Sequence, residues 1–145
     1  MSAQAFALAP AETPQPEHAL KARTARHHAL VVDDSPDITD MLAAVLRHAG
    51  YEVSTANSAQ DALEAALAQR FDVVVSDIGM PGMNGYELAR ALRALPEYSA
   101  VPMVAVTGFA MYDDRDRALD AGFNTHLSKP ISPWDLTQAL SGVRH

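Results

Sequence analysis

Five short apolar runs alternate with longer, helix-like segments from residue 29 to the end of the chain. The runs begin at Ala29, Tyr51, Phe71, Val101 and Phe123. Uninterrupted apolar runs are typical of parallel strands buried on both faces, and their regular alternation with helices indicates βα units. We therefore predict a doubly wound α/β fold, in which helices cover both faces of a five-stranded parallel sheet.

Turn and capping residues mark the expected ends of several helices. Ser35, followed by proline, suits an N-cap, and Gly50 suits the end of the same helix. Asn84 with Glu87 three residues later forms a capping-box pattern. Strands are predicted over 29–32, 51–55, 71–76, 101–106 and 123–127, and further helices over 58–69 and 111–121. In the helix over 58–69, Leu67 is expected to face the sheet.

Composition excludes several classes of function. The net charge of −7 argues against direct DNA binding and against an anionic membrane surface, because both require a basic face. The chain has no cysteine, so disulfides, thiolate metal sites and cysteine catalysis are excluded. No apolar run approaches the roughly 20 residues of a membrane span. We expect a cytoplasmic protein.

The first residues differ in character from the remainder. Residues 1–27 are rich in alanine, contain Pro10, Pro14 and Pro16, and lack the apolar content needed to bury a core. They also lack the basic start of a signal peptide. We predict a disordered tail over 1–27 and a single domain over 28–145.

Polar side chains stand where four of the five predicted strands end. Asp33 and Asp34 follow the first strand, Asp77 the third, Thr107 the fourth, and Lys129 lies just beyond the fifth. The carboxyl ends of parallel strands meet at one edge of a sheet, so these groups are expected to converge. One lysine cannot neutralise three carboxylates, whereas a hard divalent cation can. Oxygen-only ligands favour Mg²⁺ or Mn²⁺, and the lysine and threonine donors suit a phosphoryl group.

At these motifs the sequence resembles the receiver domain of two-component response regulators, over residues 28–145. The resemblance rests on Val31–Pro36, Val75–Gly85, Val106–Gly108 and Ala121–Phe123, with Leu127–Pro130 following. Receivers of hybrid sensor kinases look most similar. The resemblance implies a flavodoxin-like (βα)5 fold with the strand order 2-1-3-4-5.

The resemblance also implies a phosphoacceptor and its metal ligands. Asp77 would accept a phosphoryl group from a phosphohistidine of a sensor histidine kinase or of a histidine phosphotransfer protein. Asp34, Asp77 and the backbone carbonyl of Gly79 would bind Mg²⁺ directly, and Asp33 largely through water. Such a protein catalyses its own phosphorylation and slow autodephosphorylation, and is not otherwise an enzyme.

Three further residues receive roles in phosphoryl binding and switching by the same resemblance. Thr107 would donate a hydrogen bond to a phosphoryl oxygen, and Lys129 would pair with the phosphoryl group or, before phosphorylation, with Asp77. The Lys129–Pro130 peptide is expected to be cis. The family usually has Tyr or Phe three residues before the lysine, where this chain has His126. A switch that responds to pH and a histidine that only packs both remain open.

Output is expected through another protein, because the sequence offers no basic patch or further domain for DNA. Met111, Tyr112 and Trp134 are candidate anchors on the partner surface. Phe109, two residues after Thr107, would shield one side of the site, and Gly79 would leave the other side open. The sequence suggests a stand-alone receiver, and an adaptor and a phosphate sink or shuttle remain alternatives.

Two other classes fit the strand-end residues less well. A phosphatase with an aspartate nucleophile usually has an Asp-x-Asp pattern after its first strand, whereas Asp33 and Asp34 are adjacent. A flavodoxin needs a phosphate-binding loop after that strand, and the acidic run Asp33–Asp37 would repel phosphate.

Overall fold

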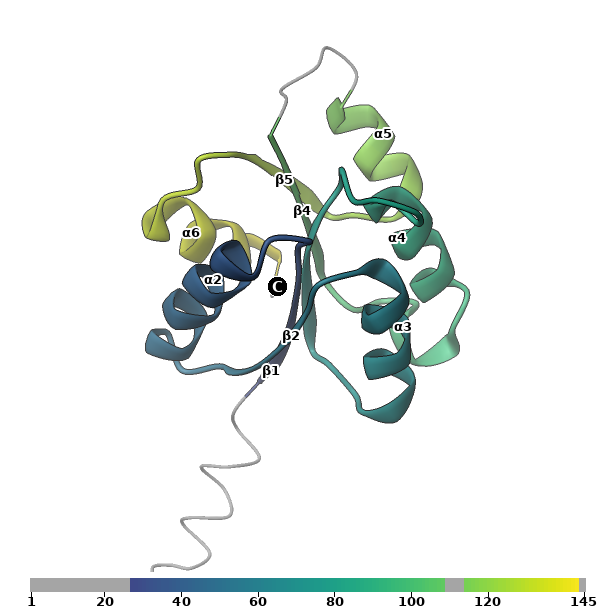
Figure 1. Ribbon diagram of the computed structural model, residues 1–145, viewed down its shortest axis with the longest axis horizontal. Helices are drawn as coiled ribbons and strands as arrows, with labels where there is room; N and C mark the ends of the chain where they lie inside the picture. Colours follow the sequence, from purple (N-terminus) through teal and green to yellow (C-terminus); the bar gives the residue numbers. More distant parts are fainter. Residues whose placement is uncertain (1–26, 109–113, 144–145) are drawn as a thin grey trace, which may run out of the picture.

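The fold is built on a sheet whose five strands all run in the same direction (Figure 1). The computed structural model describes residues 27–108 and 114–143. The strands are β1 (His28–Val32), β2 (Glu52–Ala56), β3 (Val73–Asp77), β4 (Met103–Thr107) and β5 (Thr125–Ser128). The helices are α2 (Pro36–His48), α3 (Ala59–Ala68), α4 (Gly85–Arg93), α5 (Asp114–Ala121) and α6 (Pro133–Val143), with a 3-10 turn η1 (Pro96–Tyr98) after α4.

The strand order in the sheet is β2-β1-β3-β4-β5. Figure 1 shows α2 and α6 on one face of the sheet and α3, α4 and α5 on the other. The predicted doubly wound fold and the strand order implied by the resemblance are both confirmed. This order makes β1 and β3 neighbours, so the residues that follow them come close in space although a helix, a strand and another helix separate them in the sequence.

Both faces of the sheet are sealed by apolar side chains, which explains the uninterrupted apolar runs. In β1, Leu30 and Val32 belong to the core beneath α3, α4 and α5, whereas Ala29 and Val31 belong to the core beneath α2 and α6. All four side chains are at most 1% exposed. The central strands are therefore held firmly, and only their ends are free to carry polar groups.

The capping predictions hold at most positions. Asn84 and Glu87 exchange side-chain and backbone hydrogen bonds, both of 2.9 Å, in the predicted capping box. Gly50 follows α2 with a positive φ of 102°, the conformation that favours glycine after a helix. Ser35 is the N-cap of α2, but its side chain makes no capping bond. Its backbone N–H instead donates to the Asp33 carboxylate at 2.9 Å.

Several boundaries differ from the sequence prediction. β3 and β4 begin two residues later than expected, at Val73 and Met103. Leu67 is 71% exposed, so its predicted burial was wrong: α3 buries Ala59, Ala62 and Ala66, and the next residue points about 100° away. The predicted tail lies almost wholly outside the described residues, as does the start of the helix predicted over 111–121. Within the described ranges no helix is long and apolar enough to span a membrane.

Arg93, near the end of α4, ties three segments together by donating to backbone carbonyls. Its guanidinium reaches the carbonyls of Tyr98 at 2.7 Å and Val101 at 2.6 Å, and it donates twice to Gly122, at 3.0 and 2.7 Å. It also reaches the Asn124 side chain at 3.1 Å. Burial lowers the pKa of this guanidinium. One cation therefore links the end of α4 to the loops before β4 and β5.

We expect Arg93→Met to destabilise the domain by about 2–4 kcal/mol, because three carbonyls lose a charged donor while the stem remains packed. Arg90→Met is the matched control, since Arg90 lies on the exposed side of the same helix. Urea unfolding at equilibrium measures both variants. Equal stability of the two variants would contradict a structural role for the Arg93 network.

Candidate functional site

The carboxyl ends of β1 and β3 bring three carboxylates together. Val32 pairs with Ser76 across these strands, so the next residues are Asp33 and Asp77. Ligand oxygens of Asp33, Asp34 and Asp77 all lie within 4.8 Å of one another. Asp33 and Asp77 are buried, and Asp34 is exposed. The expected meeting of the strand-end acids is present.

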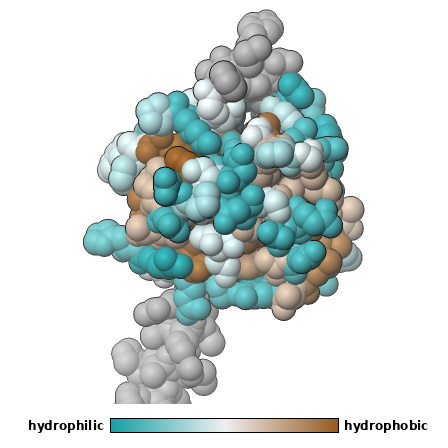
Figure 2. Space-filling view, viewed as in Figure 1, coloured by the Kyte–Doolittle hydropathy of each residue, from teal (hydrophilic) through white to brown (hydrophobic). Residues whose placement is uncertain are grey.

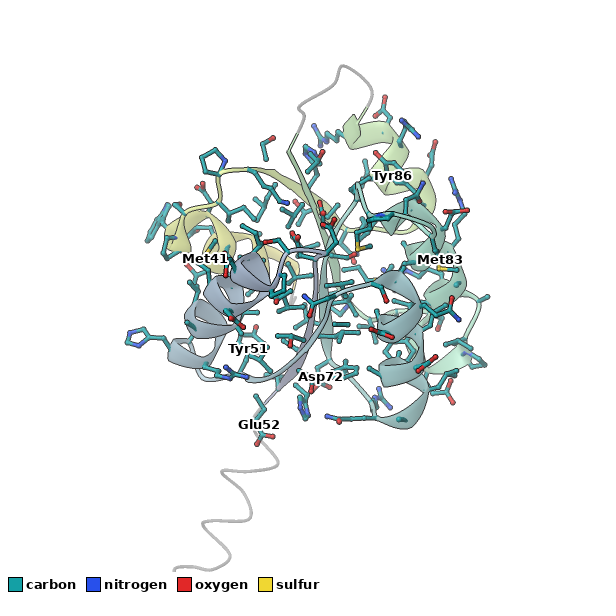
Figure 3. All side chains as sticks on the ribbon, in the orientation of Figure 1. Met41, Tyr51, Glu52, Asp72, Met83 and Tyr86 are labelled. Atoms are coloured by element: carbon teal, nitrogen blue, oxygen red, sulfur yellow. The ribbon has the colours of Figure 1, made fainter. Side chains whose placement is uncertain are left out.

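Other acidic residues of the described ranges do not all join this cluster. Figure 3 shows Glu52 and Asp72 at the opposite, amino-terminal end of the sheet. There Asp72 accepts a hydrogen bond of 2.8 Å from the backbone N–H of His28. Part of the negative charge of the domain therefore lies far from the site. The charge of the acidic cluster is balanced only by the groups next to it.

Lys129 reaches the cluster from the loop after β5. Its Nζ lies 3.0 Å from Asp33 Oδ2 and 3.5 Å from Asp77 Oδ1. Its backbone N–H donates to the Thr107 carbonyl at 2.7 Å, which anchors the loop to the end of β4. The Lys129–Pro130 peptide is cis. The sequence pointed to Asp77 as the partner of the lysine, but Asp33 is the nearer carboxylate.

The pKa values of Asp77 and Lys129 both respond to the concentration of negative charge at this site. Burial raises the pKa of Asp77, and the negative charge of Asp33 raises it further. Lys129 and the Ile78 N–H act in the opposite direction without cancelling these effects. Burial alone would lower the pKa of Lys129, but the two carboxylates outweigh it and the net shift is upward. The ammonium therefore stays charged, yet it leaves negative charge uncompensated in the pocket.

The backbone around Asp77 is fixed by short contacts. The Ile78 N–H donates to Asp77 Oδ1 at 2.9 Å, and the Ser76 hydroxyl donates to the Asp77 carbonyl at 2.9 Å. The Gly85 N–H donates to the Ile78 carbonyl at 2.9 Å. A Cβ at Gly85 would collide with the Asp77 carbonyl oxygen, so only glycine allows α4 to begin this close to β3.

The donor set fits a divalent cation. All ligand atoms of the cluster are oxygens, and the buried Asp33 Oδ2 has the Lys129 ammonium as its one partner within the described residues. Hard oxygen donors with excess negative charge suit Mg²⁺ or Mn²⁺. Gly79, two residues past Asp77, is exposed.

The remaining candidate residues lie on β4, β5 and α6 or outside the described residues. Thr107 is buried at the end of β4, where its Cα pairs with that of Ser128. His126 is half-buried on β5, and its Nε2 is buried without a hydrogen-bond partner in the described part of the chain. Trp134, in the first turn of α6, is 70% exposed. Phe109, Met111 and Tyr112 lie outside the described residues.

Two residues near the cluster escaped the sequence analysis. Asn57 follows β2 and donates from its side chain to the Asp33 carbonyl at 2.9 Å. The buried Thr39 of α2 accepts a hydrogen bond from the same amide at 3.3 Å. The strand-end argument, applied to the second strand as it was to the others, would have drawn attention to Asn57.

The sequence and the fold are both similar to known proteins. Residues 29–141 match the family described as the response regulator receiver domain. The chain is 40% identical over 111 residues to an uncharacterised 14.6 kDa protein of Leptolyngbya boryana, covering 77% of this chain and 85% of that protein. It is 39% identical over 112 residues to the sensor histidine kinase RcsC of Salmonella typhi, covering 77% of this chain and 12% of the kinase.

Two solved structures illustrate the likeness in three dimensions. The chemotaxis protein CheY4 of Vibrio cholerae has a TM-score of 0.79 and 36% identity, covering 82% of this chain and 99% of that one. The receiver domain of a sensor histidine kinase from Pseudomonas aeruginosa has a TM-score of 0.75 and 31% identity, covering 83% and 100%. That structure was solved with a magnesium ion coordinated in its active-site cleft.

We expect Asp77→Asn to raise the melting temperature by a few degrees at pH 7 without Mg²⁺. The raised pKa of Asp77 means that its ionised form costs folding free energy above the folded-state pKa. This cost disappears below the ordinary value of 3.8, so the two proteins should converge in acid. Thermal unfolding against pH measures the difference.

Asp40→Asn, a change to an exposed aspartate on α2, is the matched control and should leave the melting temperature nearly unchanged. Adding Mg²⁺ should stabilise the wild type and this control, but not Asp77→Asn. A lower melting temperature for Asp77→Asn at pH 7 would contradict the electrostatic account of the pocket.

Proposed function

This chain belongs to the response regulator receiver family, and from that premise we propose that it signals by accepting a phosphoryl group on Asp77. The observation that carries the proposal is the surroundings of this carboxylate. Asp77 is buried at the end of β3, with carboxylate oxygens of Asp33 and Asp34 within 4.8 Å and the Lys129 ammonium 3.5 Å from its Oδ1. A nucleophile, an acidic site for a cation and a cationic donor are thus gathered in one place.

Asp34, Asp77 and the Gly79 carbonyl would hold Mg²⁺ or Mn²⁺ directly, and Asp33 would do so largely through water. When bound, the cation would supply charge neutralisation for the carboxylates and for the incoming phosphoryl oxygens. The oxygen-only donor set supports this assignment, as does the magnesium ion in the related Pseudomonas aeruginosa receiver domain.

The chain's own groups would position and stabilise the transferred phosphoryl group. An oxygen of Asp77 would form the new O–P bond while the P–N bond of a phosphohistidine breaks and the imidazole leaves. Lys129 Nζ, already at the pocket, would turn to a phosphoryl oxygen, and the Thr107 hydroxyl would donate to another. A carboxylate is a weak nucleophile, so positioning and charge neutralisation would supply most of the rate.

The phosphohistidine donor would belong to a sensor histidine kinase or a histidine phosphotransfer protein. Output would follow through contact with another protein, and an adaptor and a phosphate sink or shuttle are both compatible with the site. Trp134 remains a candidate anchor for such a partner because it is 70% exposed. Figure 2 shows one face of the molecule, on which hydrophilic and apolar residues are mixed. The stand-alone state and the cytoplasmic location stay predictions.

A phosphatase with an aspartate nucleophile is less well supported. Such an enzyme places its second aspartate two residues after the nucleophile, on the same loop. Here the residue two beyond Asp77 is Gly79, and the other carboxylates come from the end of β1. The geometry therefore favours a phosphoacceptor over a hydrolase.

Incubation with acetyl phosphate and Mg²⁺ should add about 80 Da, the mass of one phosphoryl group, to the intact protein. The adduct should be absent from Asp77→Asn and from samples containing EDTA. Intact-protein mass spectrometry measures it, and Asp61→Asn is the control, because Asp61 is exposed in the first turn of α3. Labelling that persists in Asp77→Asn would overturn the assignment of the phosphoacceptor.

We expect His126→Tyr to retain phosphorylation on Asp77 and to change the affinity for the partner protein. The substitution restores the aromatic type usual in the family, and it replaces a buried Nε2 that has no partner in the described ranges. Binding of the partner to the beryllofluoride-treated protein, measured at pH 6 and pH 8, tests the role of this side chain. Identical affinities of both proteins at both pH values would remove His126 from the switch.

A further inference from the structure

The loop after β2 is joined to the loop after β1 through the side chain of Asn57. The last residues that pair between these two strands are Val32 and Ala56, and the Asp33 N–H still donates to the Ala56 carbonyl at 3.1 Å. Beyond this point β2 has ended, and no backbone N–H of residues 27–108 or 114–143 donates to the Asp33 carbonyl. Asn57 Nδ2 donates to that carbonyl at 2.9 Å and extends the ladder by one hydrogen bond.

This hydrogen bond fixes the peptide that connects the two acidic residues. The carbonyl of Asp33 and the N–H of Asp34 belong to one planar unit, so a donor that fixes the carbonyl also fixes the start of Asp34. Asp33 has further contacts through its carboxylate, with the Ser35 N–H at 2.9 Å and Lys129 at 3.0 Å. Asp34 is exposed and has no hydrogen bond or ion pair within the described ranges. The direction of its carboxylate therefore depends on the backbone that carries it.

The same amide also reaches the first turn of α2. Asn57 Nδ2 lies 3.3 Å from the Thr39 hydroxyl, which in turn donates to the Pro36 carbonyl at 3.0 Å. Thr39 is only 1% exposed, and its backbone N–H donates to the Ser35 carbonyl at 3.1 Å. One side chain from the β2–α3 loop thus holds both ends of the short segment that contains Asp34.

We propose that Asn57, acting through Thr39 and the Asp33 carbonyl, is a positioning residue that orients Asp34 for binding a divalent cation. This inference rests on the proposed cation site. Neither Asn57 nor Thr39 would touch the cation, and their contribution would be to keep the Asp34 segment in its binding geometry before the cation arrives. Because Asn57 is itself exposed, water can hydrate the Asp33 carbonyl when the amide is removed. The loss should appear in cation affinity more than in stability.

The test measures Mg²⁺ binding to the full chain by isothermal titration calorimetry, without any phosphodonor. Asn57→Ala should weaken Mg²⁺ binding about tenfold, within the range seen when groups behind metal ligands are removed. Thr39→Val, which keeps the shape but removes the hydroxyl, should weaken binding in the same direction, and Thr39→Ser should restore it. Gln60→Ala, an exposed change three residues later in the first turn of α3, should bind like the wild type.

A second readout separates positioning from a structural role. Thermal unfolding without Mg²⁺ should change little in Asn57→Ala, whereas the rise in melting temperature on adding Mg²⁺ should shrink. Wild-type affinity in both Asn57→Ala and Thr39→Val would overturn the proposal, and so would a loss of stability with Mg²⁺ affinity intact. A wild type that fails to bind Mg²⁺ would overturn the cation site itself, whereas Mg²⁺ binding without phosphorylation would refute only the phosphoacceptor.

Discussion

Three carboxylates lie within reach of one another at the ends of β1 and β3, and the fold must hold them there against mutual repulsion. The two strands that carry them are buried on both faces, so neither can move aside to relieve it. Lys129 neutralises part of the negative charge, although it follows β5 and β4 lies between β5 and β3. Its side chain reaches across the end of β4, and its backbone is tied to Thr107. The rigid sheet, the loop after β5 and the unbalanced charge therefore belong to a single arrangement.

Much of the fold was predictable because a strand that is buried on both faces appears in the sequence as an uninterrupted apolar run. The first residue of a strand is harder to predict, since a buried apolar residue need not take part in the hydrogen bonding of the sheet. Phe71 is 1% exposed, yet it precedes β3, and its N–H donates to the Tyr98 hydroxyl at 3.2 Å. Leu67 shows the opposite error, because an apolar side chain beside an inward-facing alanine on a helix can point outward. Pattern alone does not fix the rotation of a short helix.

Some residues of the site were predictable from the sequence and others were not. Asp33, Asp34, Asp77 and Lys129 were predictable because parallel topology brings strand ends to one edge. Asn57 and Arg93 act through the carbonyls of distant residues, and the sequence does not say which carbonyls a fold will leave without a donor. The preference of Lys129 for Asp33 over Asp77 depends on differences of half an ångström, which no spacing rule encodes.

Helix α5 is attached to the sheet by little apolar area. Among the described side chains of α5, those of Ala118 and Ala121 are buried, while Leu119 is 44% exposed. Burial contributes about 0.8 kcal/mol per methylene-sized group, so two methyl groups contribute far less than the leucines of α4. The stacking of Arg117 on the Tyr86 ring, at 4.6 Å, adds one polar contact to α4. Local opening of α5 therefore costs less free energy than separation of the central strands, and the sheet stays intact when this helix opens.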